Sequence, residues 1–139
     1  MSGRPKLLPS VLVALALSAT GCGKFREISA CRSVARDVNS ALDEIEALSH
    51  AKPFDGPRVA KRYATLAQTL QPQSVGETAL ARAVRDYIAI LQATDVTLRN
   101  HAEAVQPQHG KVAEPRRELE RLVKREHAAV VRIQVECQR

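Results

Sequence analysis

Apolar residues recur at spacings of three and four along most of the chain, and apolar and polar residues do not alternate over any length. This periodicity predicts amphipathic helices and no strands. The first helix is expected to end before Lys52, because the residue that precedes a proline, here Pro53, disfavours helical geometry. Its apolar stripe is Ile28, Cys31, Ala35, Val38, Leu42, Ile45 and Leu48.

A short second helix is expected after Asp55, because Pro57 is well placed for a first helical turn. Pro72 is expected to end it. Its stripe is Val59, Tyr63, Leu66 and Leu70.

The third helix has the clearest predicted start, since Ser74 and Glu77 fit a capping box. Its apolar face is unusually wide, so we expect this helix to be the most buried, and Pro107 closes it. The stripe is Leu80, Val84, Tyr87, Leu91, Leu98, Ala102 and Val105, with Ile88 and Ile90 beside it.

The last helix is expected to start between Lys111 and Pro115. Glu120 precedes Lys124 by four residues, which is the favourable order for an ion pair along a helix. The apolar side is Leu119, Leu122, Val123, Val130, Ile133 and Cys137.

The N-terminus has the three-part layout of a secretory signal peptide: basic residues Arg4 and Lys6, an apolar run from Val11 to Leu17, and then small residues. The apolar run is far shorter than the roughly 20 residues that a membrane-spanning helix needs. An exported protein is therefore expected.

The stretch LSATGC, which ends at Cys22, resembles the lipobox of bacterial lipoproteins, with Ala19 where that family more often has leucine. The resemblance implies that residues 1–21 are a signal peptide removed before Cys22, and that Cys22 is lipidated. Gly23 in place of aspartate implies the periplasmic face of the outer membrane rather than the inner membrane. The resemblance covers residues 1–22 only, and the alternative is an ordinary signal peptide cut near Ala19 or Gly21.

With Cys22 lipidated, the two remaining cysteines are Cys31 and Cys137, and we expect them to form a disulfide in an oxidising compartment. Two buried free thiols are the alternative. Short loops make consecutive helices antiparallel, so a bridge from the start of the first helix to the end of the last requires an even number of helices. The predicted fold is all-α: an antiparallel up-down bundle of four helices, one of them short, over residues 28–139, with residues 22–27 as an acylated tether.

The amino-acid composition limits the classes of binding partner that we expect. The chain has two phenylalanines, two tyrosines and no tryptophan, so it offers few stacking surfaces for bases or sugars. Its net charge is +6, of which Arg4 and Lys6 leave with the signal peptide. We therefore expect no nucleic-acid partner. Basic residues near the anchored end could rest on anionic headgroups, or could be an ordinary solvated surface: Lys24, Arg26, Arg32, Arg132 and Arg139.

Candidate chemistry is sparse. His50, His101 and His109 would gather at the end far from the membrane and are weak metal candidates, since the chain has no HxxxH or HExxH motif. Asp95 could be a buried carboxylate or could flank the helix seam and reach water. We predict no cofactor and no catalytic residues.

The sequence thus predicts a lipid-anchored helical-bundle protein that is not an enzyme, with a membrane anchor and a protein partner. It would be a binding or structural component of the cell envelope. The alternative is a small-ligand or metal carrier that uses the histidine-bearing end.

Overall fold

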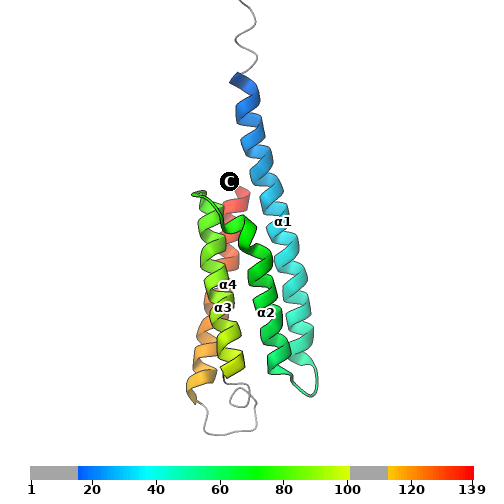
Figure 1. Cartoon of the computed structure of the whole chain (residues 1–139). Helices are drawn as coiled ribbons and strands as arrows, with labels where there is room; N and C mark the ends of the chain where they lie inside the picture. Colours follow the sequence, from blue (N-terminus) through cyan, green and yellow to red (C-terminus); the bar gives the residue numbers. More distant parts are fainter. Residues whose placement is uncertain (1–15, 101–112) are drawn as a thin grey trace, which may run out of the picture.

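A computed structural model describes the backbone of residues 16–100 and 113–139 and the side chains of residues 23–100 and 114–139. It contains four α-helices and one 3₁₀ helix: α1 (Ala16–His50), α2 (Gly56–Leu70), η1 (Gln71–Ser74), α3 (Ala79–Asn100) and α4 (Ala113–Gln138). The helices run up and down in antiparallel order (Figure 1), and no strand occurs in these two ranges. The predicted all-α, four-helix fold is confirmed.

Helix α1 starts well upstream of the predicted stripe. It includes residues 22–27, which we expected to form a tether, and it projects beyond the other helices at its N-terminal end (Figure 1). The reason is local: between Cys22 and Ile28 only Gly23 opposes helix formation, while Lys24 and Glu27 favour it. We call residues 23–30 the α1 arm.

Helix α2 begins as predicted. The Asp55 carboxylate accepts a hydrogen bond from the Arg58 backbone N–H at 3.0 Å, which satisfies an otherwise unpaired donor of the first turn. The Lys52–Pro53 peptide bond that precedes this cap is cis. At the other end, Pro72 lies in the short helix η1, which directly continues α2.

The predicted capping box at the start of α3 is wrong. The helix begins at Ala79, and its cap is Thr78, whose hydroxyl accepts from the Ala81 N–H at 3.0 Å. The Ser74 hydroxyl instead donates to the Gln71 carbonyl at 2.7 Å and closes η1. Gly76 turns the chain between the two elements with a φ of 102°, a value that residues with a side chain rarely adopt.

Helix α3 has the broad buried face that we predicted, and it packs against both α2 and α4. The core around it is mainly aliphatic, with one central tyrosine. The side chains that are essentially inaccessible to solvent include Tyr87, Leu66, Leu70, Leu91, Leu122, Val34 and Val84. The expected stripe residues Ala102 and Val105, together with Pro107, lie outside the described residues.

Helix α4 starts within the predicted interval, but its predicted ion pair is wrong. Glu120 pairs with Arg116, one turn before it, with 3.7 Å between Nε and Oε1, and not with Lys124. Both side chains of the observed pair are exposed, so the choice of partner has little effect on stability.

The predicted disulfide is present. Cys31 and Cys137 are bonded, with 5.6 Å between their Cα atoms, and so they join α1 to the end of α4. Helix α1 packs mainly on α2 and contacts α4 only sparsely. The disulfide is therefore the principal direct link between the first and last helices.

Removal of this bond should destabilise the bundle substantially. The bond closes a loop with a sequence separation of 106 residues, for which the chain-entropy model gives up to about 4.7 kcal/mol. We expect the double variant Cys31→Ser/Cys137→Ser to unfold at a much lower urea concentration than the oxidised protein. The control is the same pair of measurements with a reductant, which should destabilise the native chain and leave the double variant unchanged. Equal midpoints for both oxidised proteins would contradict this prediction.

Candidate functional site

Only one of the three histidines that we named as weak metal candidates lies in the part of the chain that the structure describes. His50 is exposed at the C-terminal end of α1, while His101 and His109 lie outside the described residues. Within the described ranges, no group of three or more histidine, cysteine or acidic residues could hold a metal ion.

Asp95 flanks the helix seam, the second of our two interpretations. Its carboxylate pairs with Arg99 one turn later on α3, with 2.5 Å between Oδ1 and Nε. The neighbouring Thr94 is the buried residue, and its hydroxyl donates to the Ile90 carbonyl at 2.9 Å. The Asp95–Arg99 ion pair spans one turn of α3 and stabilises the helix.

Sequence reasoning missed a buried carboxylate. Glu126 of α4 is only 8% exposed and lies in the core, where two tyrosines from other helices donate to it. Tyr63 of α2 donates to Oε2 at 3.4 Å, and Tyr87 of α3 donates to Oε1 at 3.3 Å. None of the ion pairs in the described residues involves Glu126. We call these three side chains the Tyr–Glu–Tyr cluster.

The electrostatics of the cluster follow from burial. Removal from water raises the pKa of the Glu126 carboxyl, and the two tyrosine hydrogen bonds offset only part of that effect because they stabilise the ionised form. Burial, together with the nearby carboxylate, also raises the pKa of both Tyr63 and Tyr87. Both phenols therefore stay protonated at ordinary pH, and the cluster holds no ready nucleophile.

The helical register contained the signal for this residue. On α4, Leu122, Glu126, Ala129 and Ile133 follow one another at spacings of four, three and four, and all four are buried. This spacing places them on one helix face. The glutamate thus occupies a core position between apolar neighbours, where a leucine would be ordinary.

An apolar pocket of about 330 Å³ lies beside this cluster, at the end opposite the disulfide. Tyr63 forms part of its wall, and the rest is mainly aliphatic or aromatic: Phe54, Val59, Leu98, Leu119 and Val123, with Ser49. Its volume is at the lower limit of small-molecule sites. It suits a small apolar molecule.

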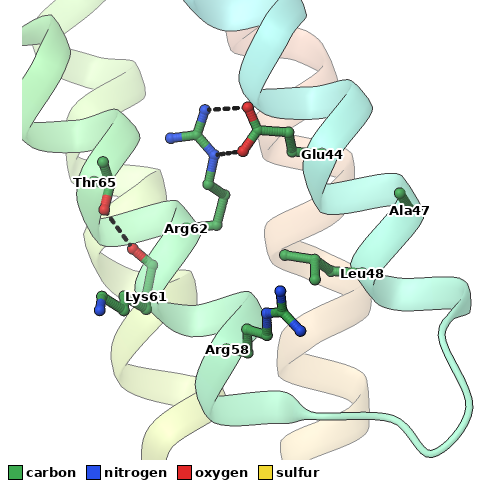
Figure 2. Close-up of a pocket in the computed structure, with 7 residues that line it drawn as sticks. All are labelled: Glu44, Ala47, Leu48, Arg58, Lys61, Arg62 and Thr65. Carbon is green, nitrogen blue, oxygen red and sulfur yellow. Dashed lines mark hydrogen bonds and ion pairs between the residues drawn. The ribbon is translucent and has the colours of Figure 1, made fainter.

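Besides this apolar pocket, a groove of about 420 Å³ lies between α1 and α2, and Figure 2 shows the residues that line it. Arg62 reaches across to Glu44: Nη2 donates to Oε1 at 3.1 Å, and Nε lies 2.6 Å from Oε2 in a charge contact without hydrogen-bond alignment. The Glu44 carboxylate is thereby committed to Arg62. Arg58 and Lys61 lie exposed at the rim, so this groove is a solvated basic surface held by one interhelical ion pair.

A second groove, of about 690 Å³, lies at the disulfide end, between the α1 arm and the start of α3. Arg26 and Glu27 line it from the arm, and Glu136 and Arg139 line it from α4. The charges of this groove are balanced, and Arg139 pairs with Glu136 at 3.5 Å.

The five basic residues considered at this end do not act as one group. Arg132 pairs with Asp86 at 2.9 Å, and Arg139 and Arg26 belong to the balanced groove. Lys24 and Arg32 are exposed and take part in none of the ion pairs of the described residues. Arg26 also takes part in none of these ion pairs, but it lies on the groove side, beside Glu27.

No protein-family model, curated protein or solved structure matches this chain. Across the described residues, no helix is both long enough and apolar enough to span a bilayer.

The buried carboxylate makes a pH-dependent contribution to stability. The unfolded chain ionises Glu126 near its ordinary pKa, about 4.3, whereas the folded chain holds the proton to higher pH. Its stabilising contribution is therefore complete below the ordinary value and is lost as the pH rises through the raised folded pKa. We expect Glu126→Gln to gain stability relative to the native chain as the pH rises, as measured by urea unfolding between about pH 4 and pH 8.

The control for this prediction is Glu120→Gln, the same change at an exposed site on the same helix. Its stability should follow that of the native chain at every pH. If the stability of Glu126→Gln and that of the native protein changed with pH in parallel, ionisation of Glu126 would carry no energetic penalty in the folded chain, which would contradict the prediction.

Proposed function

We propose that this protein is a bacterial lipoprotein: a lipid-anchored helical bundle, facing the periplasm, that serves as a non-enzymatic binding or structural component of the cell envelope. The observation that carries the proposal is the Cys31–Cys137 disulfide. It accounts for two of the three cysteines and supports export, because such bonds persist in oxidising compartments and are rare in the cytosol. The remaining cysteine, Cys22, ends the sequence that resembles a lipobox.

The position of Cys22 suits an anchor. It precedes Cys31 by nine residues on the same continuous helix, which is about 14 Å along the axis. Lipid on Cys22 would hold the disulfide end of the bundle near the bilayer and leave the opposite end free. A multiply acylated cysteine binds a membrane firmly, since one chain alone gives only marginal binding.

The non-enzymatic class is supported by the buried chemistry. Catalysis needs a positioned acid, base or nucleophile that a substrate can reach. In the described residues, the clearest cluster of interacting titratable groups is the Tyr–Glu–Tyr cluster, whose tyrosines stay protonated and whose carboxylate is shielded from solvent. We expect a protein partner, and crosslinking of the native lipoprotein in its own membrane would identify it.

Lipidation gives a direct test. We expect the chain expressed in a bacterium with an outer membrane to incorporate labelled palmitate and to fractionate with the outer membrane. Cys22→Ala should abolish the label, while the control Cys31→Ser should keep the label and lose only the disulfide. Intact mass spectrometry should find acyl groups on a chain that starts at residue 22. An unmodified Cys22 thiol in the purified protein would refute the proposal.

A small-ligand carrier is the second candidate, and the apolar pocket beside Tyr63 favours it. If the protein carries an apolar ligand, a fluorescent apolar probe should bind saturably, and Leu98→Trp should weaken this binding by filling the pocket. Val96→Trp, an exposed site on the same helix, is the control. Probe binding that is unaffected by Leu98→Trp, or that never saturates, would remove this candidate.

A further inference from the structure

The α1 arm has two chemically different faces. Arg26, Glu27 and Ala30 line the charge-balanced groove beside the bundle. The other face carries Lys24, Phe25 and Ile28, and Arg32 continues it just beyond the arm; the four recur at helical spacings and are exposed, unlike the buried residues of α1. We call these four residues the outward arm face.

The outward arm face exposes large apolar side chains that the fold does not use. Phe25 is 74% exposed and Ile28 is 52% exposed, although both could be polar at no cost to the core. Lys24 and Arg32 flank them and have no ion pair in the described residues. The only acidic residue of the arm, Glu27, lies on the groove side.

We propose that the outward arm face docks on the surface of an anionic lipid bilayer, so that α1 lies at a shallow angle to the membrane with its distal end raised. This inference rests on the proposed lipid anchor at Cys22. Phe25 and Ile28 enter the boundary between headgroups and acyl chains, while Lys24 and Arg32 contact lipid phosphates. An apolar pair flanked by cations is the pattern of helices that lie in a membrane interface.

The axial positions favour this orientation over an upright one. Phe25 and Ile28 lie about 4.5 Å and 9 Å from Cys22 along the helix. If α1 stood upright on its anchor, Ile28 and Arg32 would be held progressively farther out in water. With α1 at a shallow angle to the membrane, all four side chains can reach the interface.

The charge of the same helix face reverses farther from the anchor. Arg36, one turn after Arg32, is paired with Asp37. Beyond it, Asn39, Asp43 and Glu46 continue the face at helical spacings, and all three are exposed. An anionic surface attracts the arm and repels the two carboxylates. The contact therefore ends after Arg32, and the distal part of the bundle tilts away from the bilayer.

Vesicle binding tests the docking surface without the lipid anchor. The mature chain, which begins at residue 22, is purified with Cys22→Ser so that no acyl group contributes. It should co-sediment with phosphatidylglycerol vesicles, bind phosphatidylcholine vesicles much more weakly, and lose affinity as salt increases. Phe25→Ser should weaken binding about tenfold, and Lys24→Gln or Arg32→Gln about fivefold each.

Val96→Ser is the matched control, because Val96 of α3 is 53% exposed, nearly the same as Ile28, and lies outside the arm. It should leave binding unchanged, whereas Ile28→Ser should weaken it. Equal binding to both kinds of vesicle, or equal effects of Ile28→Ser and Val96→Ser, would overturn the docking surface. An effect of Phe25→Ser on oligomeric state but not on vesicle binding would also overturn it, and would assign the face to a second copy of the chain.

The two proposals fail separately. Vesicle binding by the Cys22→Ser chain does not depend on lipidation, whereas the palmitate label does not depend on the arm. If the native protein incorporates palmitate but the Cys22→Ser chain does not bind anionic vesicles, the lipid anchor is supported and the docking surface is excluded.

Discussion

The covalent bond between Cys31 and Cys137 is the constraint on which the architecture depends. Helices α2, α3 and α4 pack on one another through the broad apolar surface of α3, but α1 packs chiefly on α2. Without the disulfide, the noncovalent contacts would describe a core of α2, α3 and α4, with α1 packed against α2 at one side. The disulfide closes that arrangement into a ring of four, because it ties the start of the bundle to its end.

The disulfide stabilises the fold, whereas the buried carboxyl group of the Tyr–Glu–Tyr cluster destabilises it. Burial of a carboxyl group without a cation costs stability, and a leucine at the same register position would pack without that cost. The two phenols come from different helices, so their hydrogen bonds relate α2, α3 and α4 at one level of the bundle. Polar contacts of this kind favour one register of the helices over others, which an all-aliphatic core specifies less well.

The sequence predicted most of the fold and little of the candidate sites, for reasons visible in particular residues. Helices α2 and α4 were predictable because Asp55 with Pro57, and the apolar spacing from Leu119 to Ile133, are local signals that tertiary packing did not override. The capping box predicted from Ser74 and Glu77 was wrong because the sequence pattern does not reveal the preceding 3₁₀ helix, in which the same serine hydroxyl bonds to Gln71. The extent of α1 was missed because residues 22–27 have helical propensity but no apolar stripe facing a core.

Glu126 was missed for a different reason. Its position follows from the register of α4, but its burial depends on where Tyr63 and Tyr87 place their hydroxyls, and those positions are set by three helices together. The grooves are likewise products of the packing of several helices. Such features are encoded in the sequence only through the complete fold.

The continuity of α1 has a mechanical consequence. No flexible joint separates residue 22 from the body of the protein, because one uninterrupted helix spans both. A force applied at residue 22 would be transmitted along α1 to Cys31 and through the disulfide to α4. A flexible linker would absorb such a force. Residue 22 and the bundle would then move as one rigid body, so a displacement at one end of α1 would be transmitted to the other.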